Sequence, residues 1–119
     1  MSMASNAERS EALEWFDIAG VDDIIPGTGA PARLGDKQIA VFRDKTNIYA
    51  IDNLDPFSDA NVLSRGLLAD MKGRICVASP VYKQHFCLKT GECLEDATVN
   101  VRAYPVTLRD ERILVGIAE

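Results

Sequence analysis

The chain has 119 residues, of which 47% are hydrophobic and 26% are charged, as in an ordinary globular protein with one domain. Its 13 basic and 18 acidic residues give a net charge of −5. This balance argues against nucleic acid and anionic membrane surfaces as partners, because both attract clustered Lys and Arg.

The N-terminal segment, residues 1–12, is small and polar. It lacks the apolar stretch of a signal peptide, and no later apolar run is long enough for a transmembrane helix. We therefore expect a disordered lead-in over 1–12, a single domain over 13–119 and a cytoplasmic location. Cys76, Cys87 and Cys93 are odd in number and form no CxxC pair, which predicts free, buried thiols in a reducing compartment.

Short apolar segments alternate with turns along nearly the whole chain, and this pattern predicts about nine or ten short strands and no long helix. A single 3₁₀ turn is expected over Val21–Pro26, and Gly27, Gly29 and Pro31 then predict a loop. A third hairpin is expected, with strand 85–88, a turn at Thr90-Gly91 and a short second strand at Cys93–Leu94. The other expected strands are 13–18, 32–34, 38–43, 47–51, 67–70, 74–78, 99–104, 106–109 and 113–117.

Many short strands at regular spacing indicate an all-β fold, an antiparallel sandwich or barrel. Two irregular loops, 52–66 and 79–83, interrupt the succession of hairpins. Loops on a rigid β scaffold often carry function, so these two are the candidate functional segments.

The first loop contains Asn53–Phe57 and Val62–Gly66, and the second contains Ala78–Lys83, followed by Phe86–Glu92. These segments resemble the two cluster-binding loops of Rieske ferredoxins, and the similarity covers most of the chain. The resemblance implies a Rieske-like, ISP-type antiparallel β-sandwich or barrel with a small sub-domain formed by the two loops.

The residues that would hold a cluster are missing. A Rieske centre needs two Cys and two His ligands, which the family supplies as C-x-H in the first loop and C-x-x-H in the second. Here the resemblance aligns the first pair with Asp55 and Phe57 and the second pair with Ser79 and Tyr82. These four are therefore the lost ligand positions.

A shift of one residue in the first loop would instead align Pro56 and Ser58 with the first pair, and the sequence leaves this open. The ligand count does not depend on the alignment. His85 is the single histidine of the chain, so two histidine ligands cannot be supplied and a standard Rieske centre is excluded.

Three short motifs add to this pattern: D-P-F at 55–57, L-S-R-G at 63–66 and A-S-P at 78–80. Together with Trp15–Ile18, they are similar to the small subunit of assimilatory NAD(P)H nitrite reductases. The resemblance implies a non-catalytic chain without a cofactor, in an NADH- or NADPH-dependent enzyme that reduces nitrite to ammonium in nitrate assimilation. FAD, sirohaem and a 4Fe–4S cluster are then expected in its large-subunit partner.

Residues near the two loops are candidates for contact with that partner. Aromatic and Arg side chains are typical interface anchors, although the polar ones among them would also simply solvate the loops. Phe57 and Tyr82 are further expected to pack against each other or nearby and so fill the space of the missing cluster. The candidate contacts are Phe57, Arg65, Tyr82, Lys83 and Gln84.

The polar residues also have the ligand and side-chain types of a metal site or a nucleophilic site. Three Cys with His85 have the ligand types of a zinc site but not the paired spacing. Asp52, Asp55 and Asp59 would suit a cation, but Asp is also a common turn residue. Ser79 as a nucleophile with His85 as base lacks an acidic orienting group in the sequence.

Two other functions remain open at this level. One is an electron-transfer ferredoxin with a non-standard cluster held by the Cys and His residues. The other is a stand-alone β-sandwich interaction module without a reductase.

Overall fold

The computed structural model describes residues 13–118 and confirms the all-β prediction. The N-terminal segment 1–12, expected to be a disordered lead-in, lies outside these residues. The strands are β1 (Leu13–Gly20), β2 (Thr28–Leu34), β3 (Lys37–Asp44), β4 (Asn47–Asp52), β5 (Leu54–Asp55), β6 (Ala60–Asn61), β7 (Leu67–Met71), β8 (Arg74–Ala78), β9 (His85–Cys87), β10 (Ala103–Tyr104), β11 (Val106–Arg109) and β12 (Arg112–Ala118), with 3₁₀ turns η1 (Val21–Asp23) and η2 (Leu63–Arg65).

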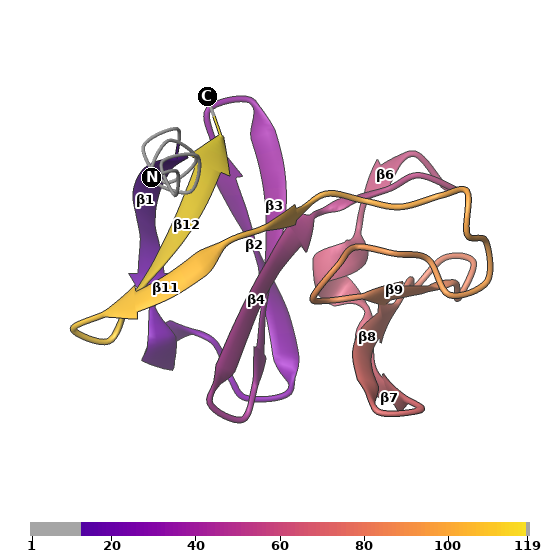
Figure 1. The fold of residues 1–119 in the computed structure, drawn as a ribbon, viewed down its shortest axis with the longest axis horizontal. Helices are drawn as coiled ribbons and strands as arrows, with labels where there is room; N and C mark the ends of the chain where they lie inside the picture. Colours follow the sequence, from indigo (N-terminus) through magenta and orange to yellow (C-terminus); the bar gives the residue numbers. More distant parts are fainter. Residues whose placement is uncertain (1–12, 119) are drawn as a thin grey trace, which may run out of the picture.

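The strands form four antiparallel sheets, in the orders β1-β12-β11, β10-β4-β3-β2, β5-β6 and β7-β8-β9. The β1-β12-β11 sheet lies at one end of the molecule, and the short sheets that carry the two predicted loops lie at the other (Figure 1). The β10-β4-β3-β2 sheet lies between these ends. The two candidate loops are thus supported by a separate pair of short sheets.

Strand β3 is buried on both of its faces, and this explains its continuous apolar run I-A-V-F. Successive side chains of a strand point to opposite faces. Ile39 and Val41 pack into a core shared with β1 and β12, whereas Ala40 and Phe42 pack into a second core beneath the loops. The same sheet therefore holds the two ends of the molecule together.

The prediction of a loop at residues 27–31 is wrong, because β2 begins at Thr28 and pairs along its whole length with β3. Pro31 is tolerated because β2 is an edge strand, where a missing N–H breaks no inner ladder. Gly29 lies against Phe42, since a Cβ atom there would meet the Phe42 ring at 2.5 Å. The local Gly and Pro signals thus reflect close packing and an edge position.

Several other element boundaries also differ from the prediction, and β5 and β6 lie within the loop predicted at 52–66. The 3₁₀ turn ends at Asp23, before Pro26. The segment 88–102 forms turn hydrogen bonds instead of a ladder: Cys93 makes only an isolated bridge, and the Val101 N–H donates to Gly91 O at 2.8 Å. The strand expected over 99–104 is consequently reduced to Ala103–Tyr104.

No helix within residues 13–118 is long and apolar enough to cross a membrane.

Candidate functional site

The two loops are joined at their base by a close approach of backbone segments. Gly66 ends the first loop, directly before β7. A Cβ atom at this position would lie 2.2 Å from Ala78 O and 2.6 Å from Val77 Cγ2. Only a residue without a side chain therefore fits here, which gives the L-S-R-G motif a steric reason.

Asn53 organises the first loop from inside, with 3% of its surface exposed. Its Oδ1 accepts a hydrogen bond from the Ser64 N–H at 2.7 Å, and its Nδ2 donates to Asn61 O at 3.3 Å. Its backbone oxygen accepts from the Leu63 N–H at 3.1 Å. One buried amide thus holds the start and the end of the loop together.

Asp55 and Ser79, one from each loop, are fully buried and hydrogen-bonded to each other. The Ser79 hydroxyl donates to Asp55 Oδ2 at 2.5 Å, and the Phe57 N–H donates to Asp55 Oδ1 at 2.9 Å. The Val81 N–H donates to Ser79 Oγ at 3.2 Å. A polar bridge between side chains 24 residues apart therefore connects the two loops where the alignment expects two cysteine ligands.

Phe57 does not pack against Tyr82, and of the two rings only Phe57 packs nearby. Phe57 is half-buried and packs on Phe86, with ring centroids 6.2 Å apart and planes at 46°. Tyr82 instead has 59% of its surface exposed. Its backbone belongs to a tight turn, in which the Ser79 N–H donates to Gln84 O and the Lys83 N–H donates to Ser79 O, and this turn directs the Tyr82 ring outward.

The outer end of the loops presents apolar side chains to solvent. Leu67, Val81 and Tyr82 are 79%, 44% and 59% exposed. A shallow pocket of about 230 Å³ lies beside them, and Arg65 and Lys83 line it. We call this the tip surface, formed by Arg65, Leu67, Pro80, Val81, Tyr82 and Lys83.

The candidate contacts predicted from sequence divide into two groups. Arg65, Tyr82 and Lys83 are exposed on the tip surface, whereas Phe57 and Gln84 are half-buried. Sequence reasoning missed Leu67 and Val81, because their apolar side chains indicate burial when they are considered alone.

The residues at the tip do not fit a Rieske cluster. Of the four aligned positions, Asp55 and Ser79 are already bonded to each other, Phe57 has no ligating atom, and the Tyr82 side chain points outward. His85 Nδ1 lies 2.6 Å from a Glu95 carboxylate oxygen. Within residues 13–118, no group of three or more His, Cys, Asp or Glu is placed to hold a metal ion.

The three Asp residues considered as a cation site have separate structural roles. Asp52 accepts the Tyr104 hydroxyl and the Arg102 N–H, Asp55 belongs to the interloop bridge, and Asp59 is an exposed turn residue with φ of 59°. Hydrogen bonds within the fold therefore account for Asp52 and Asp55, and a turn position accounts for Asp59.

Ser79 and His85 do not form a nucleophile–base pair. Ser79 Oγ bonds to Asp55, whereas His85 Nδ1 contacts Glu95 Oε2. The Glu95 carboxylate also accepts a hydrogen bond from the backbone N–H of His85 at 2.7 Å. Burial opposes ionisation of Glu95, but these bonds with His85 outweigh it and lower the pKa of the carboxyl.

The fold and the loops together define a Rieske-type β protein without a complete set of cluster ligands. Residues 14–116 match the family model described as a Rieske-like [2Fe-2S] domain. The chain is 46% identical over 99 residues to the nitrite reductase (NADH) small subunit of Escherichia coli K12, covering 82% of this chain and 92% of that one. The chain belongs to the Rieske-like domain family and, within it, to the nitrite reductase (NADH) small subunits.

Two further relatives agree with this assignment. The crystal structure of an NADH-dependent nitrite reductase small subunit from Mycobacterium tuberculosis has a TM-score of 0.86 and 40% identity, covering 90% of this chain and 97% of that one. A nitrite reductase [NAD(P)H] large subunit from Klebsiella oxytoca is 46% identical over 102 residues, which are 86% of this chain but 11% of that protein.

Proposed function

We propose that this chain is the non-catalytic small subunit of a cytoplasmic NAD(P)H nitrite reductase and docks on the large subunit through its tip surface. The observation that carries this proposal is the exposed apolar group Leu67, Val81 and Tyr82, flanked by Arg65 and Lys83, at the end of a Rieske-type fold without cluster ligands. A buried apolar centre with an aromatic and an Arg residue is typical of a protein interface.

The Klebsiella relative supports association with a large subunit. There, a segment similar to this chain is part of a protein named as the large subunit. Joining two units in one chain raises the effective concentration of each for the other, which favours contact between them. We infer that the separate chain reaches the same arrangement by non-covalent docking.

The loops supply binding in place of electron transfer. We take Asp55, Phe57, Ser79 and Tyr82 as the lost ligand positions, because the Asp55–Ser79 bond joins the loops where two thiolates would otherwise hold iron. The bridge keeps the second loop in place, and that loop carries Val81 and Tyr82 outward. The two loops of this Rieske-type fold thus present an apolar surface in place of a cluster.

Redox cofactors would belong to the large subunit. We expect FAD, sirohaem and a 4Fe–4S cluster there, as the family resemblance implies, because redox chemistry of this kind belongs to cofactors. Three free cysteines support a reducing compartment such as the cytoplasm. A cluster held by Cys76, Cys87, Cys93 and His85 is disfavoured, because Cys93 points into the core beneath the loops.

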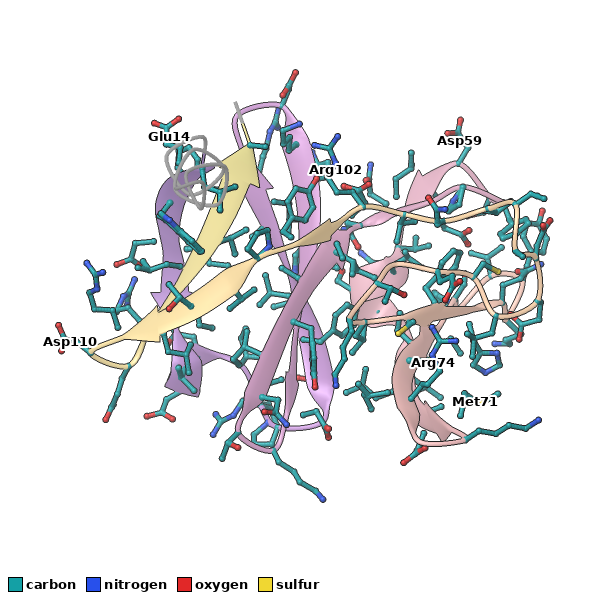
Figure 2. All side chains as sticks on the ribbon, viewed as in Figure 1. Glu14, Asp59, Met71, Arg74, Arg102 and Asp110 are labelled. Carbon is teal, nitrogen blue, oxygen red and sulfur yellow. The ribbon has the colours of Figure 1, made fainter. Side chains whose placement is uncertain are left out.

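The test uses the full chain, the purified large subunit and a matched pair of variants. Val81 on the tip and Leu108 on β11 are 44% and 46% exposed. Leu108 lies next to the β11–β12 turn, whose Asp110 is at the opposite end of the molecule from Asp59 and Arg74 (Figure 2). Val81→Asp should raise the Kd for the large subunit by about tenfold or more, as for a residue at the centre of an interface, whereas Leu108→Asp should not change it.

Binding is measured by calorimetry, and circular dichroism checks that both variants are folded. If the wild-type chain does not bind the large subunit, the proposed function is wrong. If both variants weaken binding equally, the chain is a subunit but the tip surface is not its interface.

A further inference from the structure

Cys76 on β8 and Cys87 on β9 lie directly opposite each other across two antiparallel strands. The hydrogen bonds on either side identify the type of pair. The Leu88 N–H donates to Ile75 O at 3.0 Å, so Ile75 and Leu88 form a hydrogen-bonded pair. The Cys87 N–H points away from β8 and donates to Glu92 O at 2.8 Å. Cys76 and Cys87 are therefore a non-hydrogen-bonded pair.

This type of pair brings side chains closest together. Its Cα atoms are about 4.5 Å apart, which falls inside the range of about 4.4–6.8 Å that a disulfide requires. Directly opposed residues also point to the same face of the sheet. Both thiols are free, so the fold holds two reduced sulfurs in a geometry that a covalent bond could join without strand movement.

Cys93 is on the other side of this sheet. It pairs in an isolated bridge with Phe86 and packs with Phe86 in the core beneath the loops. Phe86 and Cys87 are neighbours on β9 and point to opposite faces. The third thiol is therefore separated from the Cys76–Cys87 pair by the sheet itself.

Cys87 lines a cleft of about 520 Å³, together with Arg74, Lys89 and Thr90. Burial opposes ionisation of Cys87, but hydrogen bonding with the Thr90 side chain, the Thr90 and Lys89 backbone and Arg74 outweighs it and lowers its pKa. Burial and the nearby Cys87 raise the pKa of Cys76 to about 11. Both thiols are buried, but Cys87 lines the cleft and has the lowered pKa, whereas Cys76 is held neutral beside it.

We propose that Cys76 and Cys87 form a peroxide-sensitive dithiol site that is converted to a cross-strand disulfide. Cys87 Sγ, as thiolate, attacks one oxygen of hydrogen peroxide, the O–O bond breaks, and hydroxide leaves with the formation of a sulfenic acid. Cys76 Sγ then attacks the sulfenic sulfur, the S–O bond breaks, and water leaves with the Cys76 proton. The two thiols lose two electrons in total, and the peroxide is reduced to two waters.

The bond would act on the second loop. Strand β8 leads into the turn that carries Pro80, Val81 and Tyr82, and β9 leads out of it. A Cys76–Cys87 disulfide would therefore close this segment at its base and restrict its local opening. The dithiol chemistry itself does not depend on the proposed docking of the tip surface.

The test treats the full chain with hydrogen peroxide, blocks remaining thiols by alkylation and digests it with trypsin under non-reducing conditions. Cleavage after Arg74, Lys83, Lys89 and Arg102 places the three cysteines on three different peptides. The expected product is one cross-linked pair, 75–83 with 84–89, that dithiothreitol separates. The peptide 90–102 with Cys93 should stay alkylated.

Variants separate the two steps. Cys93→Ser should form the same cross-link at the same rate as the wild type. Cys76→Ser should stop at the sulfenic acid of Cys87, which dimedone traps. A cross-link that includes Cys93, or oxidation of Cys87 to sulfinic acid in the wild type while Cys76 remains alkylated, would overturn the proposal.

Discussion

The Asp55–Ser79 bridge offers a direct measurement of how the two loops are held together. Both side chains are fully buried, and the Asp55 carboxyl accepts from two donors, the Ser79 hydroxyl and the Phe57 N–H. Asp55→Ala leaves both donors without an acceptor. A buried donor without a partner costs about 1–3 kcal/mol, so we expect a loss of roughly 3 kcal/mol in the free energy of unfolding.

Ser79→Ala removes one partner of the same bond and the acceptor of the Val81 N–H. We expect it to cost about 2 kcal/mol. Because both variants remove the shared bond, the double variant should cost less than their sum, by about 1.5 kcal/mol of interaction energy. Asp55→Asn is the conservative control, since it still accepts from the Phe57 N–H and should lose clearly less than Asp55→Ala.

The assay is urea denaturation followed by fluorescence of Trp15, the single tryptophan, which lies on β1 with 42% of its surface exposed. Circular dichroism measured in parallel tests whether the two ends of the molecule unfold together. Strict additivity of Asp55→Ala and Ser79→Ala would mean that the interloop bond contributes no free energy of its own. The bridge would then be a consequence of packing and not a cause of it.

Three further predictions concern single sites. Gly66→Ala should lower the free energy of unfolding by about 2 kcal/mol or more, as overpacking does, because its Cβ would lie 2.2 Å from a backbone oxygen; an unchanged urea midpoint would contradict this. Tyr104→Phe removes the hydroxyl that donates to Asp52 Oδ1 at 2.5 Å and should cost about 1–2 kcal/mol in the same assay; a neutral result would show that water replaces the bond. Glu95 has a lowered pKa in the folded chain through its bonds with His85, so its contribution is present above the ordinary pKa and lost as pH falls through the folded value. Glu95→Gln should therefore destabilise the chain at neutral pH but not in acid, and an equal loss at both pH values would refute the linkage.

The class of fold and the exclusion of a standard Rieske cluster followed from the amino-acid sequence alone. Short apolar segments between turn residues are sufficient to predict an antiparallel β protein, because hydrophobic periodicity is a local property. A single histidine excludes two histidine ligands whatever the fold. The motifs of the two loops led to the family for the same reason, since their residues are contiguous.

Contacts between residues far apart in the sequence could be known only from the three-dimensional structure. The Asp55–Ser79 bond and the Cys76–Cys87 register join segments that no sequence period relates. The outward direction of Tyr82 depends on a turn closed by backbone hydrogen bonds, which side-chain chemistry does not reveal. Pro31 could be a strand residue only because β2 has a partner on one side alone.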